Sequence, residues 1–181
     1  ASGKRGGEIT MTETTLQTAG ALLASWTKGT RIPEPGRLDV LIDVADLLPA
    51  VKALRDAHWG YLIAITGLDY LGKSAVLAQE DRYKQLIEAA HAPADAGVLE
   101  VLYFFANGAA MITLRALILR DAAAVPSVCG LIPSASFYER ELSEMFGISV
   151  TGTPDPRRLF LPDVWPENQP PLRKDFVPNK E

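Results

Sequence analysis

One stretch of the chain has the spacing of a nucleotide-binding loop. Residues 67–74 read G-L-D-Y-L-G-K-S, which matches the pattern G-x-x-x-x-G-K-S. In such a loop, backbone N–H groups surround a phosphate and the lysine reaches the terminal phosphates. A second requirement is an apolar strand ending in an aspartate that helps to hold Mg²⁺. The one rough candidate, residues 116–121, is interrupted by Arg120. A small P-loop NTPase at Gly67–Ser74 is therefore kept as an alternative of a different functional class.

Three carboxylates stand close together in the last third of the chain. Glu139, Glu141 and Glu144 lie within six residues of one another. On a helix, residues two apart point in different directions, so Glu139 and Glu141 do not form a pair for acid–base chemistry. We predict a solvated or interfacial helix face here, and no catalytic residue.

The composition limits the other kinds of site. The chain has 181 residues, a formal net charge of −4 and a single cysteine, Cys129. An acidic chain without a clustered basic excess is not typical of a nucleic-acid-binding protein. One cysteine cannot form an internal disulfide or ligate an iron–sulfur cluster, and His58 and His91 add too few ligands for a metal site. We predict no bound cofactor or metal in this chain, and a buried, inert thiol at Cys129.

Hydrophobic periodicity predicts an α+β domain over residues 14–148. A mixed sheet of about four strands carries helices packed on it. Residues 98–119 are long enough to span a bilayer, but Asn107-Gly108 between apolar runs is a strong hairpin signal. The expected helices cover 14–26 and 46–58, and the expected strands cover 38–44, 61–68, 98–106 and 109–119. Residues 81–90 fit either one or two helical turns or a loop. The core is expected to include Leu23, Trp26, Leu54, Leu114 and Leu142.

A last helix is predicted from about residue 136 to residue 147. Ser136 followed three residues later by Glu139 has the spacing of a capping box. Gly147 stands where a helix commonly ends with a left-handed glycine. The apolar stripe between these ends consists of Tyr138, Leu142, Met145 and Phe146.

Residues 149–181 are predicted to form an extended, partner-binding tail. Seven prolines between Thr153 and Pro178 preclude a regular element, yet a disordered linker would contain fewer apolar residues. Arginines beside apolar residues suit contacts with carboxylates at an interface. The predicted partner-binding residues are Arg157, Arg158, Leu159, Phe160, Trp165, Leu172, Arg173, Lys174, Asp175 and Phe176. At the other end, residues 1–13 are expected to be a disordered or expression-derived leader.

The region from Glu139 to Phe176 resembles the C-subunit family of respiratory complex I, the proton-pumping NADH:quinone oxidoreductase, which includes related subunits of membrane-bound hydrogenases. The segments E-R-E-L-S-E-M-F-G, T-P-D-P-R-R-L-F and P-L-R-K-D-F carry the resemblance. Thr153 stands where the family has histidine or lysine, and Gln169-Pro170 stands where it usually has Gly-His. The signature residues of the helix are Glu139, Arg140, Glu141, Glu144, Met145, Phe146 and Gly147.

The resemblance implies a non-catalytic structural subunit in the peripheral arm of a complex-I-like oxidoreductase. Such a subunit would pack against the large quinone-site subunit and support electron transfer from NADH to quinone coupled to proton translocation. Iron–sulfur clusters, FMN and quinone are expected in partner subunits. The chain would reach the cytoplasmic side of the inner (plasma) membrane only through the complex. The equivalent subunit of a membrane-bound hydrogenase or formate hydrogenlyase is the alternative within the family.

Overall fold

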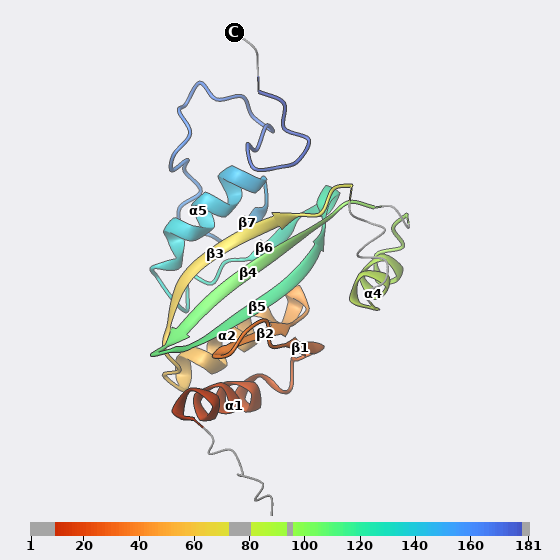
Figure 1. Ribbon diagram of the computed structural model, residues 1–181. Helices are drawn as coiled ribbons and strands as arrows, with labels where there is room; N and C mark the ends of the chain where they lie inside the picture. Colours follow the sequence, from red (N-terminus) through yellow and green to blue (C-terminus); the bar gives the residue numbers. More distant parts are fainter. Residues whose placement is uncertain (1–9, 73–80, 94–95, 179–181) are drawn as a thin grey trace, which may run out of the picture.

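A five-stranded sheet forms the centre of the molecule (Figure 1). The computed structural model describes residues 10–72, 81–93 and 96–178. The strands are β1 (Gly29–Arg31), β2 (Arg37–Leu41), β3 (Tyr61–Asp69), β4 (Val98–Asn107) and β5 (Ala110–Leu119), in the order β1-β2-β5-β4-β3. β2 runs parallel to β5, and the other neighbours are antiparallel. The predicted α+β fold with a mixed sheet is confirmed. The additional strand is β1, which is too short to show a periodic pattern.

The long apolar run of residues 98–119 is the central hairpin of this sheet. Asn107 pairs with Ala110 at its closed end, and Gly108 has a φ of 60°, as the tight turn requires. Alternate residues face opposite sides of the sheet, so Leu99, Val101 and Tyr103 all point to the main core. Within the described ranges, no helix is both long and apolar enough to cross a membrane.

Among the elements that the structure describes, three helices cover one face of the main sheet, and one helix lies on the other. α1 (Met11–Leu23), α2 (Leu47–Asp56) and α5 (Ala135–Phe146) contribute to the main core. α4 (Asp81–Ala89) packs Tyr83 and Ile87 against Val98 and Leu117 at one end of the opposite face (Figure 1). Two short 3₁₀ turns, η1 (Val44–Asp46) and η2 (Arg120–Ala122), complete the connections.

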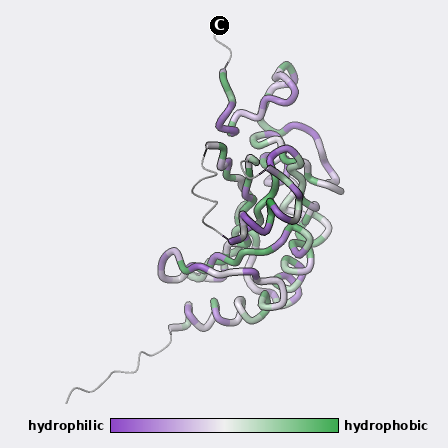
Figure 2. Tube along the Cα trace, turned by 90° about the vertical axis from the view of Figure 1, so that its right-hand side faces the viewer, coloured by the Kyte–Doolittle hydropathy of each residue, from purple (hydrophilic) through white to green (hydrophobic). Residues whose placement is uncertain are grey.

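The predicted core residues gather in one cluster. Leu23, Leu54, Leu114 and Leu142 are buried together, and Trp26 packs against them while partly exposed. Figure 2 shows the hydrophobic residues concentrated along the sheet, whereas the C-terminal tail carries both hydrophobic and hydrophilic stretches.

The first helix begins earlier than its apolar spacing predicts. Thr10 caps α1, because the Glu13 N–H donates to the Thr10 hydroxyl at 3.2 Å and the Glu13 carboxylate accepts from the Thr10 N–H at 2.7 Å. This is a capping box. Residues 10–13 therefore belong to the folded domain, which corrects the predicted leader of residues 1–13; residues 1–9 lie outside the described residues.

A second, two-stranded sheet connects α5 to the rest of the domain. β6 (Ala124–Pro126) precedes α5 and pairs in parallel with β7 (Ser149–Thr151), which follows it. The residues where the predicted tail begins are thus paired with a strand of the domain. After β7 the tail leaves the domain and loops over the C-terminal end of α5 (Figure 1).

Candidate interaction site at the signature helix and the tail

The two ends of α5 differ in how well the sequence predicts them. Gly147 is left-handed, with a φ of 62°, and its N–H donates to the Ser143 carbonyl at 2.8 Å. The predicted C-terminal cap is confirmed. The helix begins at Ala135, however, and its N-cap residue is Ser134, whose side chain makes no capping hydrogen bond. Ser136 lies inside the helix, so the predicted capping box between Ser136 and Glu139 is wrong.

Glu139 is unavailable for capping because its side chain points into the protein. It is 1% exposed, and its carboxylate accepts hydrogen bonds from the Ser127 hydroxyl at 2.8 Å, the Val128 N–H at 2.6 Å and the Cys129 thiol at 3.1 Å. A buried carboxylate requires such donors to replace water. This corrects the predicted solvated face for Glu139, which instead ties α5 to the segment after β6.

Cys129 is buried, as predicted from its apolar neighbours. Burial raises the pKa of the Cys129 thiol, and the Glu139 carboxylate raises that pKa as well, against an opposing hydrogen bond with Ser127. The thiol therefore stays protonated at neutral pH and serves as a hydrogen-bond donor to Glu139.

Arg140 holds the first part of the tail. Its guanidinium donates from Nε to the Arg157 carbonyl at 2.8 Å and from Nη2 to the Arg158 carbonyl. Its Nη1 lies 3.4 Å from a carboxylate oxygen of Asp155. Hydrogen bonds from the Arg157 side chain and backbone, together with the Arg140 charge, lower the pKa of Asp155 well below its usual range. Asp155 therefore remains an anion between two arginines.

Glu144 holds the next turn of the tail. Its carboxylate accepts hydrogen bonds from the N–H groups of Leu159 at 3.2 Å, Phe160 at 2.9 Å and Leu161 at 2.9 Å. Three consecutive N–H groups converge on one anion only when the backbone curls around it. Glu144 thus binds the protein's own backbone.

Arg173 fastens the tail to the C-terminal end of α5. It donates from Nε to the Phe146 carbonyl at 2.6 Å and from Nη2 to the Gly147 carbonyl at 3.2 Å. The Leu172 N–H donates to the Met145 carbonyl at 3.0 Å. A cation at this place satisfies carbonyls that the helix leaves without a partner and favours the negative end of its dipole.

The tail is also attached to the end of the main sheet. The carboxylate of Asp69, the last residue of β3, accepts a hydrogen bond from the Lys174 N–H at 3.0 Å. Arg120 forms ion pairs with Asp69 at 3.3 Å and with Asp175. Residues 173–175 therefore contact three elements at once, namely α5, β3 and η2.

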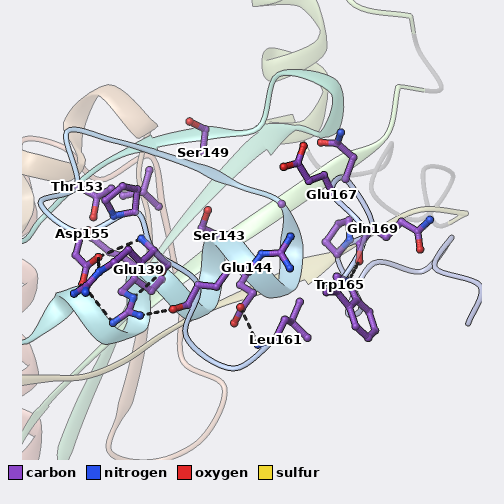
Figure 3. A pocket seen from close by; sticks show the side chains of 18 of the residues that line it. Glu139, Ser143, Glu144, Ser149, Thr153, Asp155, Leu161, Trp165, Glu167 and Gln169 are labelled. Carbon is purple, nitrogen blue, oxygen red and sulfur yellow. Dashed lines mark hydrogen bonds and ion pairs between the residues drawn. The ribbon is translucent and has the colours of Figure 1, made fainter. Parts of the chain in front are cut away.

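A groove of about 430 Å³ lies between α5, β7 and the tail (Figure 3). Its lining is mostly polar and includes Ser143, Ser149, Thr153, Glu167 and Gln169. The Thr153 hydroxyl oxygen is buried and has no hydrogen-bond partner among the described residues. This is the position at which the signature of the resembled family has histidine or lysine.

The tail has a small aromatic cluster of its own. The rings of Trp165 and Phe176 stack with centroids 5.8 Å apart and an angle of 25° between their planes. The Trp165 indole N–H donates to the Gln169 carbonyl at 2.9 Å, and the Arg158 guanidinium donates to the Pro162 carbonyl at 2.8 Å. These contacts give the proline-rich segment a defined path without a helix or strand.

The apolar side chains of the tail divide into two groups. Leu159, Leu161, Trp165 and Phe176 are partly covered. Phe160 is 64% exposed and Leu172 is 55% exposed. Val164 and Val177, at 89% and 76%, are exposed apolar residues that the sequence prediction missed. Each valine stands beside an aromatic residue in a proline-rich segment without a period, so no periodic signal identifies it.

The basic residues of the tail also divide. Arg158 and Arg173 bind backbone carbonyls of the chain itself. Arg157 pairs with Asp155, although its side chain is 81% exposed. The Lys174 side chain is exposed and has no ion pair within the part of the chain that the structure describes. Arg157, although paired with Asp155, and Lys174 are therefore the cations of this group whose side chains are exposed.

The nucleotide-binding pattern does not form a phosphate loop over its first three residues. Gly67 and Leu68 continue β3 and pair with Val101 and Glu100 of β4. An extended strand does not wrap successive N–H groups around an anion. Gly67 is instead a packing position, because a Cβ there would lie 2.9 Å from the Phe146 ring. The pattern's last two residues, Lys73 and Ser74, lie outside the described residues.

The sequence matches a known family over most of its length. Residues 40–181 match the model of the family described as respiratory-chain NADH dehydrogenase, 30 kDa subunit. The NADH-quinone oxidoreductase C-subunit of Roseiflexus sp. (strain RS-1) is 32% identical over 143 residues, which are 77% of this chain and 70% of that protein. Hydrogenase-4 component G of Escherichia coli (strain K12) is 48% identical over 66 residues, which are 36% of this chain and only 12% of that protein.

Solved structures show the same fold. The membrane-bound sulfane sulfur reductase, an archaeal respiratory membrane complex, contains a chain that superposes with a TM-score of 0.62 and 16% identity, covering 91% of this chain and 86% of that one. A trypsin-resistant fragment of Nqo5 superposes with a TM-score of 0.51 and 22% identity, covering 79% of this chain and 97% of the fragment. With the family match over residues 40–181, the chain belongs to the family of the respiratory-chain NADH dehydrogenase 30 kDa subunit.

Proposed function

We propose that this chain is a structural subunit in the peripheral arm of a complex-I-like NADH:quinone oxidoreductase, where its tail packs against the large quinone-site subunit. The observation that carries the proposal is the orientation of the tail. Its backbone is bound to α5 and β3, while Phe160, Val164 and Leu172 face solvent.

Such a surface is typical of an interaction site. A chain that orders a proline-rich segment while it leaves Phe160, Val164 and Leu172 exposed gains little hydrophobic stabilisation from those side chains. Exposed aromatic and aliphatic side chains beside arginines are common where two proteins meet. A partner that covers Phe160, Val164 and Leu172 would recover that stabilisation.

In this proposal the chain supports electron transfer by holding other subunits in place. Iron–sulfur clusters, FMN and quinone would belong to those subunits, and proton translocation would be a property of the whole complex. The chain would lie on the cytoplasmic side of the inner (plasma) membrane and contact the membrane only through its partners.

The names of related proteins support a large D-type subunit as the partner. The NADH-quinone oxidoreductase C/D-subunit of Chromohalobacter salexigens is 52% identical to this chain over 52 residues, which are 8% of that protein. Its name assigns the letters C and D to one protein. In that protein the C-type and D-type portions would meet within one polypeptide. We infer that this chain uses the corresponding surface to meet a separate D-type subunit.

A second candidate is the equivalent subunit of a membrane-bound hydrogenase. Formate hydrogenlyase subunit 5 of Escherichia coli (strain K12) is 45% identical over 66 residues, which are 12% of that protein. Hydrogenase-4 component G is similar over a segment of the same length. In this case the tail would pack against the large subunit of a hydrogenase in the same way.

Co-purification distinguishes the two candidates. The tagged chain is expressed with the D-type large subunit of an NADH:quinone oxidoreductase or with a hydrogenase large subunit. Both large subunits are taken from the genome that encodes this chain. We expect a stable one-to-one complex with one of the two. Replacing Phe160 and Val164 by serine should abolish that complex, whereas Tyr61→Ser, which removes an equally exposed aromatic residue at the start of β3, should leave it intact. Failure to bind either large subunit would refute the proposal.

A further inference from the structure

We propose that Glu144 is a positioning residue that orients Phe160 as the anchor of the interface with the large subunit. This inference rests on the proposed function and assigns a task to one residue of the family signature. Its basis is the contact between the Glu144 carboxylate and three consecutive backbone N–H groups of the tail.

The contact fixes which side chains of the turn face outward. Leu159 and Leu161 are partly covered, whereas Phe160, which stands between them, is 64% exposed. Because all three N–H groups point at Glu144, the backbone has little freedom to rotate so that Leu159 or Leu161 faces solvent in place of Phe160. The largest side chain of the turn is therefore held in solvent by an anion beneath it.

Arg140 strengthens this arrangement from the preceding residues. It lies one residue after Glu139 on α5 and binds the carbonyls of Arg157 and Arg158. Arg140 thus binds the carbonyls of residues 157–158, and Glu144 binds the N–H groups of residues 159–161. Together they hold one continuous stretch of tail backbone. A planar guanidinium can reach both carbonyls together, which a lysine ammonium does less well.

An anchor held in this way lowers the cost of association. Ordering a flexible segment during binding costs conformational entropy, and a segment that is already ordered avoids this loss. Aromatic side chains that enter a pocket on the partner commonly account for much of the binding energy of an interface. The surface therefore fits a partner with an apolar pocket, into which Phe160 inserts without rearrangement of the tail.

Two variants and a control test the assignment in the full-length chain. The first measurement is amide hydrogen exchange. Glu144→Gln removes the charge and should accelerate exchange at residues 159–161 by about tenfold or more. Phe160→Ala and Glu141→Gln, the latter an exposed acid on the same helix, should leave exchange there unchanged. Exchange that is unchanged in Glu144→Gln overturns the positioning role.

The second measurement is the affinity for the purified large subunit that is encoded with the chain. Phe160→Ala should weaken binding by about tenfold or more, and Glu144→Gln should also weaken it, with Glu141→Gln equal to wild type. If Glu144 acts through Phe160, the double variant with Glu144→Gln and Phe160→Ala should have nearly the same affinity as Phe160→Ala alone. Fully additive losses overturn the coupling, and unchanged binding of Phe160→Ala overturns the anchor.

The two measurements separate this inference from the proposed function. If the wild-type chain binds no large subunit, the proposed function fails and the anchor fails with it, while hydrogen exchange still decides whether Glu144 orders the tail. If the wild-type chain binds and Glu144→Gln loses exchange protection without losing affinity, the proposed function stands and the positioning role of Glu144 in assembly is overturned.

Discussion

At the scale of single residues, the acidic side chains of α5 have different environments although they are close in the sequence. Glu139 is buried beneath the helix, Glu141 is exposed, and Glu144 is covered by the tail. The family signature therefore combines a residue of the domain interior with a residue that binds the tail. Both act on backbone N–H groups of this chain.

Removing the buried carboxylate should destabilise the domain. In Glu139→Ala the Ser127 hydroxyl, the Val128 N–H and the Cys129 thiol lose their acceptor. We expect a loss of roughly 2–4 kcal/mol in the free energy of unfolding, because buried donors are left without partners. Urea denaturation measures this loss. Glu141→Ala is the control and should change stability by less than about 0.5 kcal/mol; equal effects of the two variants would contradict the burial argument.

The glycine of β3 that begins the nucleotide-binding pattern should be intolerant of a side chain for a packing reason. In Gly67→Ala the added Cβ meets the Phe146 ring at 2.9 Å, and such overpacking costs about 1–3 kcal/mol. The melting temperature should fall accordingly. Gly29→Ala in β1 is the matched control, because a Cβ there meets nothing within 4 Å. If Gly67→Ala is as stable as Gly29→Ala, the contact with Phe146 is not what requires glycine.

At the scale of secondary-structure elements, a charged network joins the central strands on the face opposite the main core. Arg115 of β5 donates to Asp39 of β2 at 2.8 Å and to both carboxylate oxygens of Glu100 of β4 at 2.8 and 2.6 Å. Arg31 of β1 donates a further hydrogen bond to Asp39, and Tyr70, the residue after β3, donates one to Glu100. Hydrogen bonds to Glu100 raise the pKa of Arg115, so the guanidinium stays charged. The network links strands that lie far apart in the sequence.

This network should make stability sensitive to acid. Burial raises the pKa of Asp39, but hydrogen bonds from Arg31 and Arg115 outweigh it, so the pKa of Asp39 is lowered in the folded state. A carboxylate with a depressed folded pKa stabilises the protein fully above its unfolded pKa of about 3.9. That contribution disappears as the pH falls through the folded pKa, because the unfolded state binds more protons.

Urea denaturation between about pH 5 and pH 2 tests this expectation. Asp39→Asn should be less stable than wild type at pH 5, and the difference should narrow towards pH 2. Glu141→Gln, which changes an exposed acid, should follow the wild-type curve. Curves for Asp39→Asn and wild type that remain parallel over this range would show that Asp39 does not couple stability to pH.

At the scale of the whole molecule, the domain and the tail are held together mainly by polar contacts. Arg140 and Glu144 of α5 bind tail backbone, and Arg173 of the tail donates to a carbonyl at the end of α5. The buried cluster, by contrast, is formed by residues up to Val150. The division into a domain of residues 14–148 and a tail of residues 149–181 remains a prediction that truncation can test.

Truncation after Gly152 should leave the domain folded and prevent assembly with the large subunit. The truncated chain retains the core and the pairing of β7 with β6, so circular dichroism should still show a cooperative thermal transition. Truncation after Phe176 is the control, since it keeps the contacts of Lys174, Asp175 and Phe176, and it should still assemble. A chain that unfolds when cut after Gly152 would show that the tail is part of the domain's own fold.

Much of the fold follows from local sequence patterns. The hairpin of β4 and β5 follows from Asn107-Gly108 between apolar runs, and the end of α5 follows from Gly147. The main core follows from the periodicity of its helices and strands, because a side chain's face depends on its spacing within an element. The signature around α5 likewise indicates the family from residue types and spacing alone.

The partners of the polar side chains were decided by the tertiary structure. Glu139 has the spacing of a helix cap, yet Ser127, Val128 and Cys129 become its donors only when β6 and α5 pack together. Asp39 meets Arg115 across 76 positions of sequence. Such contacts depend on distances between elements, which no local period contains. The sequence by itself determined most of the longer elements and the family to which the chain belongs, but not the short strands β1, β6 and β7. The packing of the elements determined that Arg140 and Glu144 hold the tail, because hydrogen bonds are set by atoms that meet in space.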